Sequence, residues 1–214
     1  MTTDPETEPG EPAGRDDALT AAQGAALVRL AVQTVRRRLL GAEPDVAPPP
    51  TPALAQRGAS FVTLERRGRL LGCIGSLQPV RPLFLDVSRN AGRAMRDPRL
   101  PPVSADDWPE LDVEVSVLTP AEPMPVAGRA ELVAALRPRV DGLVLTDGVR
   151  RSTFLPAVWA KISDPAVFLD RLLVKGGWAP GGWPTGLAAS RYRTVEFHDR
   201  APRGPLGGGS AAAG

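Results

Sequence analysis

The stretch ASFVTLERRGRLLGCIG, residues 59–75, predicts the hairpin around which the rest of the fold is organised. Residues 60–66 and 69–74 both form short apolar runs that are typical of β-strands. Arg67 and Gly68 lie between the two runs and provide a tight turn. The sequence therefore predicts two neighbouring antiparallel strands in this region.

The second of these strands carries Cys73, the only cysteine in the chain, with Gly72 and Gly75 beside it. Glycines inside a strand allow a ligand or another part of the backbone to approach closely. Two interpretations are open at this point: Cys73 is a thiol in a binding site, or it is a small apolar side chain in a tightly packed strand. The only histidine, His198, lies near the end of the chain, and nothing in the sequence places it beside Cys73 as a base.

Hydrophobic spacing predicts the remaining elements. Helices are expected from a cap at Thr20 to a stop at Gly41, in a short segment opening at Thr51-Pro52, and over 80–95, 128–136 and 165–175. Strands are expected over 111–118 and 190–199, and a second hairpin over 141–156 with Asp147-Gly148 as a two-residue turn. Hairpins interspersed with helices indicate an α+β fold, with mixed, mostly antiparallel sheets and flanking helices.

The two ends of the chain differ from its centre. Residues 1–17 are rich in Pro, Glu and Gly and are expected to be a disordered acidic tail, and residues 200–214 a flexible Gly/Ala-rich tail. Residues 18–199 are expected to form the folded part. With one cysteine, no export signal and no long apolar stretch, the chain is predicted to be a cytoplasmic protein without an internal disulfide or a membrane segment.

The charge of the chain is nearly balanced, with a formal net charge of +2. Lys161 and Lys175 are the only lysines, and all other strong cations are arginines. The densest basic runs, 35–40 and 66–69, are short. Nucleic-acid binding through arginines is therefore the least favoured of the functional alternatives.

Three further residues have side chains suited to chemistry. Glu114 and Ser116 lie on one face of the strand at 111–118, which forms either an exposed polar face or the floor of a cleft. Lys175 lies in the last turn of a predicted helix, where it interacts with the helix dipole or with an anion. One histidine and one cysteine are too few for a zinc site, and no phosphate-binding loop is present, so no metal or cofactor is expected.

Several motifs in this order resemble a known family. They are GRLLGCIGSLQP (68–79), NAGRAMRDPRLPPV (90–103), ELDVEVSVLTPAEPM (110–124), DGLVL with RSTFLPAVW (141–159) and DPAVFLDRLLVKGGW (164–178). Together they resemble the AMMECR family, whose prokaryotic members are called AmmeMemoRadiSam system protein A, over about residues 20–198. Two positions depart from the family motifs: Leu71 replaces the usual arginine before Gly-Cys-Ile-Gly, and Leu100 replaces a phenylalanine.

The resemblance implies an α+β fold with two subdomains, a cleft between them, and the signature cysteine near that cleft. It also implies that the protein works beside a Memo-type, dioxygenase-like protein and a radical S-adenosylmethionine enzyme. By motif, the expected catalytic residues are Cys73, Glu114 and Lys175, and the expected binding residues are Gly72, Gly75, Asp97, Arg99 and Ser116.

Two main hypotheses of function follow. In the first, the protein is a thiol-dependent enzyme or enzyme component acting on a small polar substrate in the cleft. Cys73 is then the nucleophile or thiol carrier, Glu114 the acid or base, and Lys175 or Arg99 stabilises negative charge. In the second, the protein is a non-catalytic adaptor for the two partner enzymes.

Overall fold

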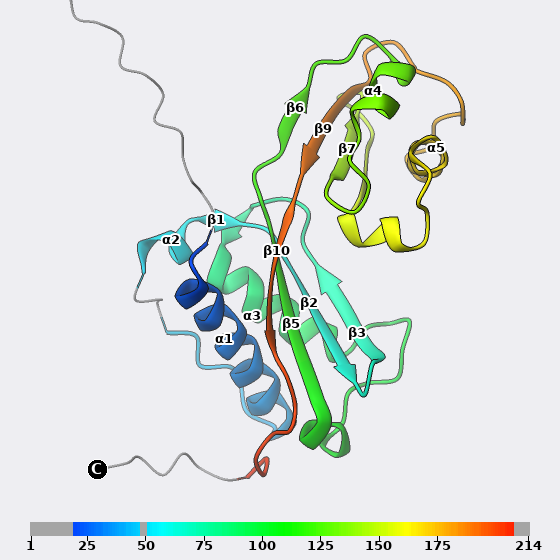
Figure 1. The fold of residues 1–214 in the computed structure, drawn as a ribbon. Helices are drawn as coiled ribbons and strands as arrows, with labels where there is room; N and C mark the ends of the chain where they lie inside the picture. The colour runs from blue at the N-terminus through cyan, green and yellow to red at the C-terminus, as the bar shows by residue number, and fades with distance from the viewer. Residues whose placement is uncertain (1–18, 48–50, 208–214) are drawn as a thin grey trace, which may run out of the picture.

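The computed structural model describes residues 19–47 and 51–207 (Figure 1). The helices are α1 (Ala21–Leu39), α2 (Pro52–Ala55), α3 (Leu83–Ala94), α4 (Arg129–Ala135) and α5 (Pro165–Lys175), with 3-10 turns at Ala105–Glu110 and Pro156–Ala160. The strands are β1 (Arg57–Gly58), β2 (Ser60–Arg66), β3 (Arg69–Gly75), β4 (Arg81–Pro82), β5 (Leu111–Leu118), β6 (Glu122–Met124), β7 (Gly142–Thr146), β8 (Arg151–Phe154), β9 (Ala188–Tyr192) and β10 (Thr194–Asp199). The predicted tail at 1–17 lies outside the described residues.

Two four-stranded antiparallel sheets organise the molecule, which confirms the α+β class. The first sheet has the order β10-β5-β2-β3 and the second the order β6-β9-β7-β8. The second sheet and its helices come from residues 122–192, which lie in the chain between β5 and β10 (Figure 1). We call residues 122–192 the insert lobe and the rest of the described chain the main lobe.

The hairpin that the sequence predicts is confirmed. β2 and β3 pair antiparallel from Arg66 opposite Arg69 to Phe61 opposite Gly75. Arg67 and Gly68 have φ angles of 51° and 74°, so both turn residues are left-handed. Two consecutive left-handed residues match the right-handed twist of the flanking strands and close the hairpin tightly.

Helices α1 and α3 cover one face of the first sheet and enclose the core of the main lobe. The inward side chains of β2 and β5, among them Val62, Leu64, Val113 and Val115, are fully or almost fully buried. Thr20 caps α1 through a capping box, as the sequence predicts. Because the helices cover one face only, the opposite face of the sheet is left for polar side chains.

The insert lobe has a core of its own, built on one face of the second sheet. Trp159 stacks on Phe168 of α5 with ring centroids 3.8 Å apart, and the indole nitrogen donates to the carbonyl of Asp141. Asp164 caps α5 by accepting from two backbone N–H groups, and the helix spans Pro165–Lys175 as predicted.

The last predicted strand, 190–199, is wrong as a single element. The structure divides it at Arg193 into β9 of the insert lobe and β10 of the main lobe. At this point the returning chain runs beside the outgoing one: Thr119 N donates to Arg193 O, and Arg193 N donates to the Thr119 hydroxyl, both at 2.9 Å. The apolar side chains change phase at the crossing, because Tyr192 and Val195 are three residues apart whereas Val195 and Phe197 are two apart, and the sequence analysis did not use this signal.

Two other boundaries also differ from the predictions. The helix predicted over 80–95 begins only at Leu83, because Arg81 and Pro82 pair with β1. The predicted two-residue turn at Asp147-Gly148 is a four-residue loop, since Thr146 pairs with Arg151. The Asp147 carboxylate stabilises this loop by accepting from two backbone N–H groups within it.

Residues 200–207, which the sequence assigns to a flexible tail, lie against the main lobe. The Arg203 side chain donates to the carbonyl of Leu111, and Trp108 donates to that of Gly204. Residues 208–214 lie outside the described residues. Within the described part of the chain, no helix combines the length and the apolar character needed to span a bilayer.

Candidate functional site

Cys73 lies on β3, the edge strand of the first sheet, and its backbone is held from both sides. Its N–H donates to Asp97 Oδ2 at 3.1 Å, and its carbonyl accepts from Arg99 Nη2 at 3.0 Å. Arg99 also forms an ion pair with Asp97 at 2.6 Å. Two of the residues predicted to bind substrate therefore clamp the strand that carries the cysteine.

The Asp97 carboxylate is fully buried, whereas the Arg99 side chain is 66% exposed. Hydrogen bonds from Arg99 hold the pKa of Asp97 well below its ordinary value, although burial acts in the opposite direction. Asp97 is therefore an anion at neutral pH. Its negative charge is already matched by Arg99 within the protein.

The Cys73 thiol lies in a row of side chains on the outer face of the sheet. Thr63 is opposite Cys73 on one side and opposite Glu114 on the other, and its hydroxyl donates to Cys73 Sγ at 3.4 Å. Glu114 is in turn opposite His198 on β10. Cys73 and His198 are thus three strands apart, about 14 Å, so His198 is not the base of a Cys-His pair.

Both glycines beside Cys73 are required by packing. A Cβ atom on Gly72 would overlap the carbonyl oxygen of Ala94 at the end of α3. A Cβ atom on Gly75 would overlap the ring of Phe61. Close approach of the protein's own helix and ring therefore accounts for these glycines, with no need for a ligand at either position.

Glu114 and Ser116 form a second group on the outer face. Ser116 donates to Glu114 Oε1 at 3.0 Å, and His198 Nδ1 lies 3.5 Å from Glu114 Oε2. Glu196 lies beside them. One side-chain atom each from Glu114, Glu196 and His198, of a kind that can bind a metal ion, lies within 4.8 Å of the other two. The sequence analysis missed Glu196, because the pairing of β10 with β5 was not predicted.

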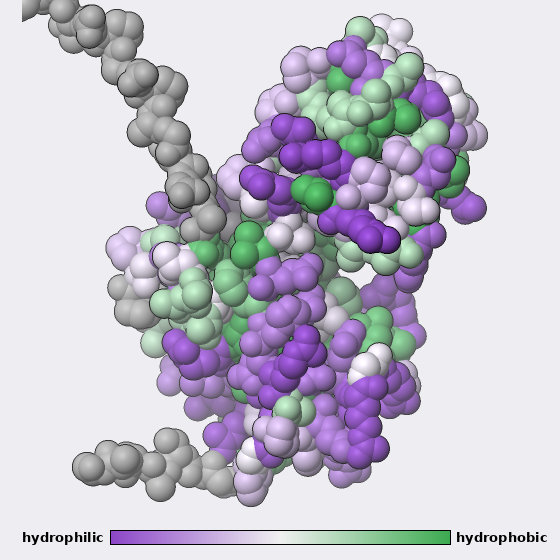
Figure 2. Space-filling view, in the orientation of Figure 1, coloured by the Kyte–Doolittle hydropathy of each residue, from purple (hydrophilic) through white to green (hydrophobic). Residues whose placement is uncertain are grey.

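A cleft between the lobes forms a third region. Figure 2 shows an opening between the lobes, and two cavities of about 310 and 440 Å³ are lined by residues of both. Leu77, Arg151 and Thr153 line both cavities, which makes them neighbouring parts of one cleft. Its main-lobe wall includes β1 and the segment after β3, and its insert-lobe wall includes the open face of the second sheet.

The cleft carries positive charge and no negative charge on its walls. Arg57, Arg81, Arg151 and Lys175 line it, and none of its described lining residues is acidic. Lys175 donates to the Thr153 carbonyl at 2.8 Å and lies 5.0 Å above the Phe154 ring. The sequence analysis offered an anion as one partner of Lys175, and the other cations of this cleft wall could attract one. Cys73 is not among the described residues that line either cavity.

The smaller cavity has an apolar character, with Leu77, Leu118 and Val144 around it. Tyr192 lies on its insert-lobe side, where its hydroxyl bonds to the Thr153 hydroxyl and the Phe154 carbonyl. Burial raises the pKa of Tyr192 to about 12, so the phenol stays neutral at physiological pH.

In the larger cavity, Ser152 is one of the lining residues and is nine-tenths buried. Its hydroxyl oxygen has no hydrogen-bond partner among the described residues. Ser152 pairs with Leu145, whose side chain is in the core of the insert lobe, so the Ser152 hydroxyl lies on the core face of the second sheet and not on the face that carries Thr153.

A buried carboxylate positions the main-lobe wall of the cleft. Asp86 of α3 is fully buried and accepts from the hydroxyls of Ser60 and Ser76 at 2.8 Å and from Asn90 at 2.9 Å. It also accepts from Arg81 Nη1 at 2.5 Å. Arg81 is therefore fixed at the cavity surface, while its charge is shared with Asp86 beneath it.

The predicted site residues therefore fall into three places: the strand clamp (Gly72, Cys73, Gly75, Asp97 and Arg99), the outer-face group (Glu114 and Ser116) and the cleft (Lys175). The cleft residues Arg57, Arg81, Arg151 and Tyr192 were missed. Arg81 falls in a predicted helix and Arg151 in a predicted hairpin, so no local pattern relates them, and only the arrangement of the lobes brings them together.

Comparison with known proteins agrees with the motif resemblance. A family profile described as AMMECR1 matches residues 28–197. A protein from Methanothermobacter thermautotrophicus is 38% identical over 185 residues, which are 85% of this chain and 96% of the relative. One from Thermofilum pendens is 34% identical over 202 residues, 88% of this chain and 95% of the relative. The crystal structure of an uncharacterized protein from Pyrococcus horikoshii matches with a TM-score of 0.73 and 32% identity, over 85% of this chain and 94% of that chain. The chain belongs to the AMMECR1 family.

Proposed function

We propose that this protein binds a small organic anion in the cleft between its lobes. The observation that carries the proposal is the charge of the cleft, which four cationic side chains line without a carboxylate among the described lining residues. Cations gathered on the walls of a concave site raise the local concentration of an anionic ligand. Ligand sites also combine an apolar surface with a few convergent polar groups, as this cleft does.

The two cavities indicate the shape of the ligand. A carboxylate or phosphate fits the larger cavity, where Arg81, Arg151 and Lys175 converge. An apolar portion fits the smaller cavity beside Leu118 and Val144. Phenyl phosphate and benzoate combine both features and serve as probes.

Calorimetric titration of the full chain with phenyl phosphate tests this proposal. Arg151→Gln and Lys175→Gln each remove one cation and are expected to weaken binding about tenfold. Arg171→Gln and Lys161→Gln remove the same charges from exposed positions of the insert lobe and serve as matched controls. The proposal fails if neither probe binds, or if the cleft variants bind as the controls do.

A more specific version of the proposal is that the bound anion takes part in a reaction that depends on the Cys73 thiol. Its support is the position of Cys73 on β3, three residues before Ser76, which lines the larger cavity. The Thr63 hydroxyl, which donates to Cys73 Sγ at 3.4 Å, is a further support, because it places a polar partner directly beside the sulfur. If Cys73→Ser leaves both binding and turnover in a reconstituted pathway unchanged, the thiol has no part in the reaction.

The adaptor role is a second candidate, which rests on the motif resemblance alone. In this form the protein binds its ligand and works beside a Memo-type protein and a radical S-adenosylmethionine enzyme, as the motif resemblance implies. Affinity purification of the tagged chain from its native host is the direct test. Recovery of neither partner, with the protein itself recovered folded, contradicts this role.

A further inference from the structure

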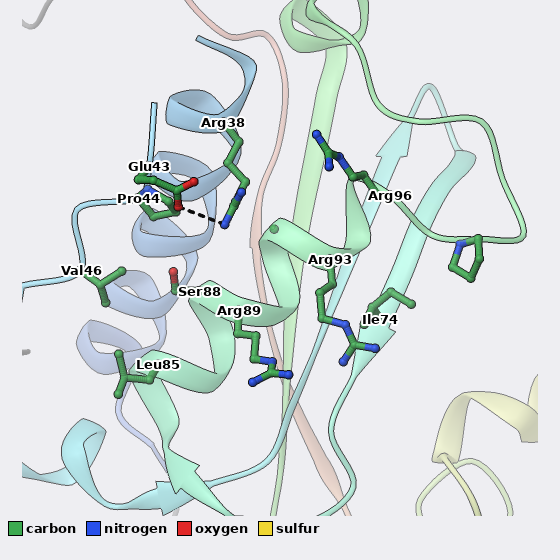
Figure 3. Close-up of a pocket in the computed structure, with 12 residues that line it drawn as sticks. Arg38, Glu43, Pro44, Val46, Ile74, Leu85, Ser88, Arg89, Arg93 and Arg96 are labelled. Carbon is green, nitrogen blue, oxygen red and sulfur yellow. Dashed lines mark hydrogen bonds and ion pairs between the residues drawn. The ribbon is translucent and has the colours of Figure 1, made fainter. Parts of the chain in front are cut away.

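An arginine-rich groove lies on the main lobe, away from the interlobe cleft. Arg89 and Arg93 extend from α3, Arg38 reaches toward them from the end of α1, and Arg96 follows in the turn after α3 (Figure 3). The cavity between them is about 610 Å³. We call it the arginine groove and define it by these four residues.

The charge of the groove is mostly unmatched. Among the described residues that line it, Glu43 is the one acidic residue, and it pairs with Arg38 at 3.4 Å (Figure 3). Within the described part of the chain, Arg89, Arg93 and Arg96 form no ion pair with a carboxylate. Arg93, in the last turn of α3, also interacts favourably with the helix dipole, but Arg89 lies a full turn earlier and gains little from it.

The backbone makes room for this arrangement. Arg38 lies across Gly92 of α3, where a Cβ atom would come 2.7 Å from Arg38 Nε. The glycine thus allows Arg38 to reach the arginines of α3 across the junction of the two helices. Leu85, Val46 and Ile74 give the groove an apolar base.

We propose that the arginine groove binds the acidic segment at the start of this same chain. Residues 1–17 contain Asp4, Glu6, Glu8, Glu11, Asp16 and Asp17 against a single cation, Arg15. Guanidinium groups bind carboxylates through paired, charge-assisted hydrogen bonds. The segment is therefore negatively charged, opposite to the positive charge of the groove.

The N-terminal segment is long enough to reach the groove from the start of α1. Arg38 lies about 27 Å along α1 from Thr20, at 1.5 Å per helical residue. A fully extended chain from Thr20 back to Glu11 spans about 30 Å, and one to Glu8 about 40 Å. In an extended chain, Glu6 and Glu8 lie about 6.6 Å apart, close to the 6 Å rise between Arg89 and Arg93.

A nucleic acid is the less suitable occupant. None of the described residues that line the groove is aromatic, so it offers no surface on which bases could stack. The acidic segment has the further advantage of its covalent link, which gives it an effective concentration of roughly a millimolar.

The test is the rate at which a Glu-specific protease releases the N-terminal segment from the full chain. A bound segment is protected, so Arg89→Gln/Arg93→Gln/Arg96→Gln is expected to raise the rate at least about threefold. The control is Arg29→Gln/Arg69→Gln/Arg171→Gln, which removes equal charge from exposed arginines outside the groove. Circular dichroism establishes that both variants are folded.

Inorganic tripolyphosphate provides the second measurement. If the segment occupies the groove, tripolyphosphate displaces it and accelerates cleavage of the wild-type chain, but not of the groove variant. Equal cleavage rates in all three proteins overturn the proposal. Tripolyphosphate binding to the groove without any change in cleavage also overturns it, in favour of an external polyanion.

Discussion

Asp86 and Asp97 are two buried carboxylates whose surroundings differ: Asp97 bonds to β3 at Cys73, and Asp86 bonds to Ser76, the residue that follows β3. Asp86 accepts bonds from several elements at once and supports the cleft wall through Ser76 and Arg81. Asp97 has one main partner, the largely exposed Arg99, and holds the backbone of Cys73. Asp97, which the motif comparison singled out, thus supports β3, whereas Asp86, which the sequence analysis did not mention, supports the cleft wall.

This comparison predicts the largest effect for Asp86→Ala. The change leaves the partly buried Arg81 without its counterion and several buried donors without an acceptor. Breaking such a buried pair costs about 4 kcal/mol in the free energy of unfolding, measured by urea denaturation. The exposed Asp45→Ala is the control, and a loss below about 1 kcal/mol would remove the contrast between the two carboxylates.

Asp97→Asn is expected to cost less, about 2 kcal/mol at pH 7, because fewer groups lose a charged acceptor. The pH dependence sharpens the comparison. Arg99 lowers the pKa of folded Asp97 below its ordinary value of 3.8, so the stabilisation is complete above that pH and is lost as the pH falls below it. The stability difference between wild type and variant should therefore shrink below pH 3.8. A difference that is constant with pH contradicts the ion-pair explanation.

The two glycines give a smaller, paired prediction. Gly72→Ala places a Cβ atom against the backbone oxygen of Ala94 and is expected to cost about 2 kcal/mol. Gly75→Ala meets only the Phe61 ring, which can move, and is expected to cost about 1 kcal/mol. Thermal unfolding of both variants shows which one loses more stability. A larger loss of stability for Gly75→Ala than for Gly72→Ala would contradict this account of the packing.

The smallest effect concerns the thiol itself. Thr63→Val removes the hydroxyl that donates to Cys73 Sγ and is expected to slow iodoacetamide alkylation at fixed pH by about twofold. Thr185→Val, an exposed position on the insert lobe, is the control. A rate equal to that of wild type would show that Thr63 does not influence the thiol.

Local patterns predicted the hairpin at 60–74, the capping of α1, the extent of α5 and the strand at 111–118, because each depends on neighbouring residues. The division at Arg193 was missed because both halves favour a strand, although the apolar spacing shifts by one residue between Tyr192 and Val195. The cleft could not be predicted from local patterns. Arg81 and Arg151 are far apart in the sequence, and only the packing of the two lobes brings them to one cavity.

The crossing at Thr119 and Arg193 also bears on how the molecule could be divided. Because the outgoing and returning chains are hydrogen-bonded neighbours there, a short turn could join them and omit residues 122–192. The shortened chain would retain every strand of the first sheet and both of its covering helices. The insert lobe is thus a detachable module whose sequence can diversify independently. Its removal would take one wall of the cleft with it and leave the first sheet with its two helices.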